Sequence, residues 1–335
     1  MPLYDKPHLE YPAQLEKLTK RGLICADRDR ALHVLKRVGY YRLSAYVYPF
    51  RTPLPFSEQV DYHYRSEEIQ AGTTFDEVER LCAFDASLRQ LCLAAAETIE
   101  VGLRTQIAYV LGRRDTFGHV SAASLDPKKC AKPTKKGTWF SDWQDRYAIL
   151  LDKARGEDFI RHNLSKYDGS PLPVWIATEI LDFGALARLY GLMQVSDMNQ
   201  VAGSVGFRSG PRFQTVMQVI GLVRNHAAHH GRLWNRNLMI ALPAYYETEL
   251  PQDLRHLSAL GSTHKLYAPL ATMAHLVRSI DPLSNWPRAL RTHVTKFPSG
   301  TGLDPNRDMG FPQGWQGERL WHDAPRGCPA DSSSP

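Results

Sequence analysis

Long apolar runs are missing from this 335-residue sequence, which never approaches the ~18 uncharged apolar residues of a membrane-spanning helix. Its first residues, MPLYDKPHLEYPAQ, lack the apolar stretch of a signal peptide. Paired cysteines are missing too, because the five cysteines are scattered and form no CxxC motif. We therefore expect a cytoplasmic protein with free thiols and without a membrane partner.

Phosphate-binding loops and strand patterns are also absent. No GxGxxG or P-loop motif occurs, so nothing predicts a nucleotide cofactor. Apolar and polar residues never alternate cleanly over more than a few positions. Apolar residues instead recur every three to four positions in most segments, which predicts an all-α helical bundle.

Charge gives the first indication of a partner. Lys and Arg number 41 against 35 Asp and Glu, for a formal net charge of +6. This excess favours a polyanionic partner such as RNA, although many proteins of similar charge bind no nucleic acid.

Helical periodicity divides the chain into an N-terminal basic helical region (1–70) and a helical domain (71–297) with an inserted polar loop (115–138). A capping box, with Thr74 as N-cap and Glu77 three residues later, marks the start of the strongest helical signal. The segment 39–51 fits a helix or an extended chain equally well. Helices are predicted at 11–22, 27–38, 75–95, 96–113, 140–163, 173–193, 211–230, 263–280 and 284–296.

The Gly- and Pro-rich tail, 298–335, is expected to behave in two ways. Trp315 and Trp321 are costly to leave in water, so we expect 309–321 to dock on the body. Residues 323–335 have the composition of a disordered end.

The sequence RNHAAHHGRLWNR (224–236) concentrates polar residues directly behind an apolar helical run. At ~100° per residue, Arg224 falls in the centre of the stripe that contains Met217 and Ile220. A guanidinium in that position must be paired or must face a cleft. His229 lies about 140° around an ideal helix from Arg224, and Gly231 is expected to stop the helix and distort its last turn.

Spacing alone leaves three interpretations of this cluster open. It is typical of a helix C-terminus, where the macrodipole favours histidine. His226 and His230, four residues apart, suit a metal pair, but the Glu of HExxH and a third ligand are missing. An arginine beside a histidine also suits cleavage of RNA, since histidine moves protons and arginine stabilises the phosphorane charge.

The stretch RNHAAHHGRLWNR resembles the signature of the Abi family of bacterial abortive-infection proteins, of the AbiD/AbiF type, which belong to the HEPN superfamily. The resemblance extends over most of residues 7–321, and Cys82 departs from it where an aromatic residue is expected. Six further stretches resemble family blocks in family order: LTKRGL (18–23), VGYYRLSAYVYPFR (38–51), TFDEVERLCAFDASLR (74–89), IEVGLRTQIAYVLG (99–112), PVWIATEILDFGALARLY (173–190) and MGFPQGWQGERLW (309–321).

This resemblance implies a helical bundle of HEPN type and a ribonuclease motif, R-x(4–6)-H. Arg224 and His229 match the motif with four intervening residues, and His230 would match with five. Arg224 would stabilise the phosphorane, His229 would act as general acid or base, and Asn225 would position the phosphate or the histidine. The resemblance further implies metal-independent cleavage without a cofactor, in a cleft between two subunits of a homodimer.

Supporting residues are predicted on a second helix. Glu97, Glu100 and Arg104 lie within ~60° of each other on one face. They form either a solvated ion pair or a supporting group, in which Glu100 pairs with Arg224 or orients His229.

Several basic side chains are candidate contacts for RNA phosphates, with an ordinary solvated surface as the competing interpretation. These are Arg42, Lys135, Lys136, Arg232 and Arg236. Tyrosines in the segment 39–51 are expected to be mostly core rather than base-stacking residues.

The expected function is therefore an RNA endoribonuclease of phage defence, in an abortive-infection or toxin–antitoxin system. RNA would be its substrate, and a structured small RNA a possible bound partner. The alternatives are a non-catalytic RNA-binding module that sequesters RNA and, third, a metal-dependent hydrolase.

Overall fold

The computed structural model describes residues 7–60, 63–167, 169–243, 247–298 and 302–322. Apart from two short antiparallel strands, β1 (Arg51–Pro53) and β2 (Arg65–Ile69), the regular elements in these ranges are helices. The all-α class is thus confirmed, and the small sheet is an addition that the sequence pattern did not predict. Within the same ranges no helix has both the length and the apolar character to cross a membrane.

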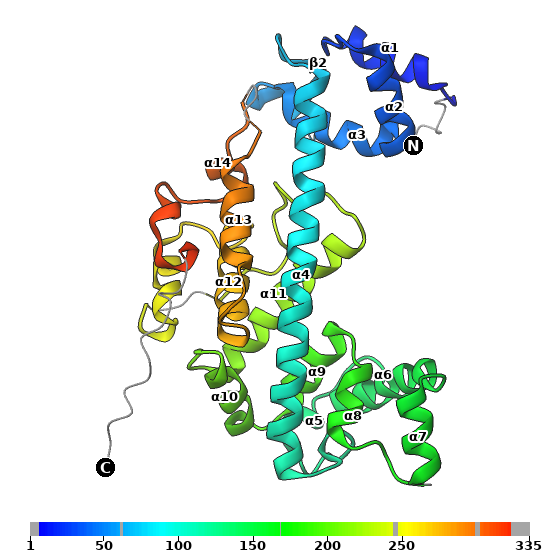
Figure 1. The fold of residues 1–335 in the computed structure, drawn as a ribbon, viewed down its shortest axis with the longest axis vertical. Coiled ribbons are helices and arrows are strands. Elements are labelled where there is room, and N and C mark those ends of the chain that lie inside the picture. The colour runs from blue at the N-terminus through cyan, green and yellow to red at the C-terminus, as the bar shows by residue number, and fades with distance from the viewer. Residues whose placement is uncertain (1–6, 61–62, 168, 244–246, 299–301, 323–335) are drawn as a thin grey trace.

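Helix α4 (Phe75–Arg114) is the spine of the molecule, and its 40 residues extend about 60 Å (Figure 1). The predicted capping box starts it: Glu77 N donates to Thr74 Oγ1 at 3.2 Å, and Thr74 N donates to Glu77 Oε2 at 2.8 Å. We predicted two helices, 75–95 and 96–113, where the structure has one. Three consecutive alanines, 94–96, stand at the expected junction and favour continuation of the helix.

The N-terminal helices lie beside the beginning of α4, at one end of the molecule (Figure 1). They are α1 (Tyr11–Lys20), α2 (Arg28–Val38) and α3 (Tyr40–Val47). The segment 39–51, undecided from sequence, is therefore mainly helical. Gly39 separates α2 from α3 with a φ of 83°, a backbone conformation that suits glycine. Tyr46 is buried on α3, whereas Tyr41 is 91% exposed.

The opposite end is built from shorter helices than the periodicity predicts. They are α5 (Pro127–Cys130), α6 (Trp139–Ala154), α7 (Asp158–Lys166), α8 (Val174–Ala177), α9 (Phe183–Leu192) and α10 (Val195–Ser204). The expected helices 140–163 and 173–193 are each broken, and α10 was missed. The second break lies before Asp182, whose side chain caps α9 by accepting from Ala185 N at 2.8 Å.

The expected surface loop 115–138 is only partly a surface loop. It contains α5 and a short 3-10 helix, and it buries His119, Leu125 and Cys130. Trp143 of α6 fixes it by donating from Nε1 to the His119 carbonyl at 2.6 Å.

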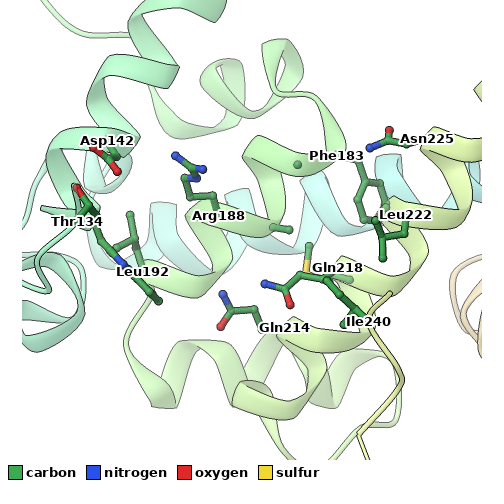
Figure 2. A pocket seen from close by; sticks show the side chains of 15 residues that line it. Thr134, Asp142, Phe183, Arg188, Leu192, Gln214, Gln218, Leu222, Asn225 and Ile240 are labelled. Carbon is green, nitrogen blue, oxygen red and sulfur yellow. The ribbon is translucent and has the colours of Figure 1, made fainter. Parts of the chain in front are cut away.

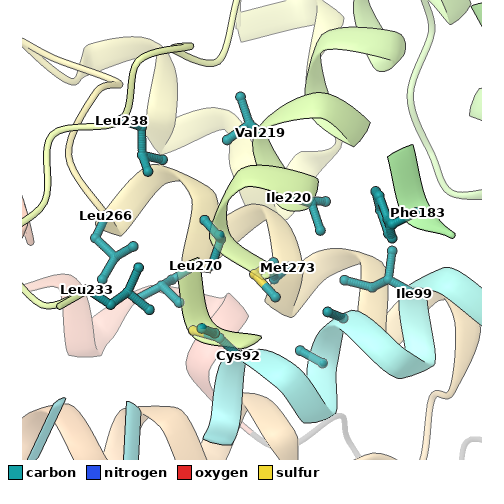
Figure 3. Packing of buried hydrophobic residues seen from close by; sticks show 14 of the residues in the cluster. Cys92, Ile99, Phe183, Val219, Ile220, Leu233, Leu238, Leu266, Leu270 and Met273 are labelled. Carbon is teal, nitrogen blue, oxygen red and sulfur yellow. The ribbon is translucent and has the colours of Figure 1, made fainter. Parts of the chain in front are cut away.

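The core forms where α4 meets α11 (Gly210–Ala228) and α12 (Tyr267–Ile280). Cys92 and Ile99 of α4, Ile220 of α11 and Met273 of α12 face one another there (Figure 3). Leu233, from the chain just after α11, packs into the same cluster. Helix α11 is therefore held on the spine close to residues 224–236, the arginine–histidine segment.

The C-terminal part packs along one side of the spine. Helix α13 (Trp286–Thr295) contacts α4, and α14 (Pro305–Met309) precedes a buried aromatic cluster. Trp315 and Trp321 are 3% and 0% exposed, and Trp321 lies 6.2 Å from the ring centre of Tyr267 on α12. The predicted disorder of 323–335 falls outside the described residues.

Short 3-10 helices occupy Tyr48–Phe50, Phe56–Glu58, Gly118–Val120, Thr178–Ile180, Glu247–Glu249, Gln252–Ala259, Trp315–Gly317 and Arg319–Trp321.

Candidate active site

Helix α11 carries Arg224 and Asn225 in its last turn. Its buried face consists of residues such as Ile220 and Val223, and Arg224 lies partly exposed beside that face. Arg224 Nη1 donates to Asn225 Oδ1 at 3.3 Å. No carboxylate of the described chain lies within ion-pair distance of Arg224, so its guanidinium remains available to an anion.

The helix ends in a Schellman turn built on a histidine. Gly231 N donates to the His226 carbonyl at 2.8 Å, and His230 N donates to the Ala227 carbonyl at 3.0 Å. His230 takes the left-handed position with a φ of 56°, the one non-glycine residue with positive φ among those described. We expected Gly231 to stop the helix, but the turn reverses one residue earlier, at His230. A left-handed non-glycine residue costs roughly 1–2 kcal/mol, so the surroundings must hold it.

Contacts from the N-terminal helices hold this turn. Arg42 of α3 donates from Nη1 to the His230 carbonyl. Arg232 donates from Nη1 to the Ala45 carbonyl, also on α3, at 2.6 Å. The N-terminal region is thereby attached to both sides of Gly231.

Asp85 of α4 anchors the chain just beyond the turn. Its carboxylate accepts from Leu233 N at 3.1 Å and from Trp234 N at 2.7 Å. It also accepts from Tyr46 Oη at 2.7 Å and from Arg89 Nη1. Burial raises the pKa of Asp85, while these four donors favour its charged form.

Sequence reasoning missed Asp85, Tyr46 and Arg89. A signal was nevertheless present, because Asp85 stands four residues after Leu81 and three before Leu88, both buried. An acid on the apolar face of a helix requires partners in the core. The Asp85 network positions the arginine–histidine segment without providing a group that is open to a substrate.

The three histidines of the segment occupy different environments. His229 and His230 are exposed, whereas His226 is half-buried. Burial, with the nearby charges of Arg236 and His229, lowers the pKa of His226. Because His230 has left the helix, it does not continue the face of His226 as an i, i+4 ligand pair would. The described part of the chain contains no group of three His, Cys, Asp or Glu side chains arranged to hold a metal ion.

The expected supporting acid pairs within its own helix. Glu100 accepts from Arg104 Nη2, which also donates to the Leu181 carbonyl at 2.5 Å. Burial raises the pKa of Glu100, and the charges of Arg104 and Arg224 oppose that rise. The charge of Arg224 therefore acts on Glu100 from a distance, but the two side chains form no ion pair. Glu97 is exposed and lies outside this pair.

The candidate phosphate contacts fall into two groups. Arg42, Arg232 and Arg236 lie around the turn, but each donates to a main-chain carbonyl, Arg236 through Nε to Arg232 at 3.0 Å. Lys135 and Lys136 are exposed in a tight turn, which Thr134 N closes by donating to the Gly137 carbonyl at 2.9 Å.

A cavity of about 500 Å³ opens beside Asn225 and follows the outer face of α11 towards this lysine turn (Figure 2). It lies between α9, α11 and the start of α6. No sequence pattern predicted it, because its walls come from four separate segments, the fourth represented by Ile240.

Comparison with known families finds a match to the family described as Abi-like protein, over residues 33–235. No curated protein and no solved structure matches the chain. The matched region includes α3, α4 and the arginine–histidine segment except its last residue, Arg236, and it spans more than half of the sequence. The chain belongs to the Abi-like family.

Proposed function

We propose that this protein is a metal-independent RNA endoribonuclease of HEPN type that acts in bacterial phage defence, as an abortive-infection or toxin–antitoxin component. The observation that carries the proposal is the end of α11. It presents an arginine without an ion pair among the described residues and an exposed histidine five residues later, on a turn fixed by Asp85 and Arg42. Membership in the Abi-like family supports the defence role.

In this reaction the 2′ oxygen of a ribose attacks the adjacent phosphorus, and the bond to the 5′ oxygen breaks. His229 takes the proton of the 2′ hydroxyl or gives one to the departing 5′ oxygen. Arg224 stabilises the negative charge on the phosphorane, and Asn225, which already contacts Arg224, orients it. The products carry a 2′,3′-cyclic phosphate and a 5′ hydroxyl.

A homodimer is part of the proposal. In the described part of one subunit no hydrogen bond joins Arg224 to His229, and His229 is the residue that follows the helix. Two copies that face each other would supply two arginines and two histidines to one cleft. RNA is the proposed partner, both as the cleaved strand and as a bound structured small RNA.

The test uses purified protein and total bacterial RNA in the presence of EDTA. We expect cleavage with 5′-hydroxyl ends by the wild type, and loss of at least ~100-fold in rate for His229→Ala with RNA affinity retained. His162→Ala, which changes an exposed helical histidine on α7, is the matched control and should cleave normally. Cleavage that EDTA abolishes, or that His229→Ala retains, would contradict the proposal.

A further inference from the structure

We propose that the cavity beside Asn225 binds an unpaired nucleobase of the RNA strand, next to the phosphate that Arg224 binds. This inference rests on the proposed function and deepens it, because the cavity would select among bases of the RNA strand that is cleaved. Figure 2 shows the cavity between Asn225 at one end and Thr134 and Asp142 at the other.

The floor of the cavity is apolar and its rim carries free amides. Phe183, Met217 and Leu222 provide the floor. Gln214 and Gln218 point into the space from α11, and neither amide has a hydrogen-bond partner within the described ranges. An apolar surface combined with unpaired donors and acceptors suits a planar heterocycle, which has apolar faces and polar edges.

Close packing of α9 on α11 creates this arrangement. A Cβ atom at Gly191 of α9 would lie 2.1 Å from Gln214 Nε2, so only glycine lets that amide remain where it is. A Cβ atom at Gly221 would lie 3.3 Å from Phe183 Cδ1. Glycine at these two positions therefore lets α9 and α11 pack closely around Gln214 and Phe183, which both line the cavity.

The charge of the cavity favours a base over a phosphate. Its one arginine, Arg188, is exposed and has no ion pair in the described structure, while Asp142 contributes a carboxylate to the same wall. These charges nearly cancel, whereas a phosphate site collects positive charge. A carboxylate, by contrast, can accept a hydrogen bond from the exocyclic amine of a base.

The two ends of the cavity provide a path for the strand. Arg224 lies at one end, next to Asn225. At the other end Lys132 Nζ lies 4.4 Å from the ring centre of Trp139, and Lys135 and Lys136 are exposed in the following turn. A backbone that runs from Arg224 to these lysines would place its intervening base over the apolar floor, within reach of Trp139.

The test measures binding without cleavage, in full-length His229→Ala. The probes are fluorescently labelled rA8, rC8 and rU8, and the comparison adds Gln214→Ala and Gln218→Ala to the same background. We expect the parent to prefer its best oligonucleotide over its worst by about tenfold. The double amide variant should reduce this ratio to less than about threefold. Gln144→Ala, an exposed glutamine on α6, is the matched control and should keep the preference.

Three results would overturn the inference: no preference in the parent, a preference unchanged in the amide variant, or equal loss in the Gln144 control. Unlabelled AMP, CMP and UMP form a second arm. A mononucleotide that competes as tightly as the octamer would reassign the cavity to a free nucleotide. Because no cleavage is required, this result is independent of the EDTA-resistant cleavage that tests the proposed function itself.

Discussion

At the scale of single residues, His230 and His229 differ in their backbone contacts, although both fit the R-x(4–6)-H spacing. His230 occupies the left-handed position of the turn, and its carbonyl binds Arg42. His229 closes the helix through its own N–H, which donates to the Asn225 carbonyl at 2.9 Å, and its imidazole forms no hydrogen bond within the described residues. His230 therefore shapes the turn, and His229 is the histidine to which the proposed function gives the proton transfer.

This assignment predicts the effect of His230→Gly. Glycine adopts a positive φ without strain, so the free energy of unfolding should stay equal or rise by up to about 1 kcal/mol. RNA cleavage should remain within about threefold of wild type, whereas His229→Ala loses it. Urea unfolding and an RNA cleavage assay check both parts. Loss of cleavage in a stable His230→Gly protein would make His230 the motif histidine.

Asp85 predicts a second residue-scale effect. In Asp85→Asn one amide oxygen replaces a carboxylate that accepts from Tyr46, Arg89 and two backbone N–H groups. Buried donors without partners should lower the free energy of unfolding by about 3 kcal/mol. Chemical denaturation measures this, with the exposed Asp145→Asn on α6 as control. A loss below about 1 kcal/mol would show that the network does not hold the turn.

Charged residues on apolar helix faces were the most informative part of the sequence. Arg224 stood out because it interrupts an apolar stripe, and the structure places it at the open edge of α11. Asp85 interrupts a similar stripe on α4 but was overlooked, because its partners Leu233 and Trp234 lie about 150 residues away in the chain. Local spacing cannot reveal partners that only the fold brings together.

At the scale of elements, the sequence predicts helices well where the apolar periodicity is long. It predicts them poorly where a side-chain cap determines the residue at which a helix begins. The start of α4 followed from its capping box. The break before α9 did not, because Asp182 lies inside an apparently continuous apolar pattern and acts as an N-cap. The burial of His119 was not predicted either. Its neighbours come from α6, and the segment around it in the sequence is polar.

His119 predicts how this end of the molecule responds to pH. Burial lowers the pKa of His119 to about 4, from an ordinary value of 6.5. In the unfolded chain His119 therefore binds a proton below about pH 6.5, whereas in the folded chain it stays neutral down to about pH 4. The free energy of unfolding falls as the pH falls through this window. Between pH 7.5 and pH 5 this single group should cost about 2 kcal/mol.

Replacement of His119 by a ring that does not titrate should remove its contribution to the pH dependence of stability. In His119→Phe the drop in the free energy of unfolding from pH 7.5 to pH 5 should be smaller by about 2 kcal/mol than in wild type. The exposed His162→Phe should leave the drop unchanged. Urea denaturation at the two pH values gives the numbers, and an identical drop in His119→Phe and wild type would refute the account of this histidine.

At the scale of the whole molecule, one long helix joins two functions of the fold. Near its start α4 receives the N-terminal helices, and through Asp85 it fixes the turn that presents His229. Further along it carries Glu100, whose carboxylate pairs with Arg104 and lies close enough to Arg224 to interact with its charge. The cavity beside Asn225 then extends from this point to the lysine turn, so the proposed chemistry and the proposed base recognition share one surface.

The measurement that tests the central claim most directly compares bacteria that express the wild type with bacteria that express His229→Ala, during phage infection. Growth and the 5′-hydroxyl ends of total RNA are recorded together. The account predicts growth arrest and new 5′-hydroxyl ends with the wild type, and neither with His229→Ala. Growth arrest by both proteins, with the same RNA ends in each, would contradict it.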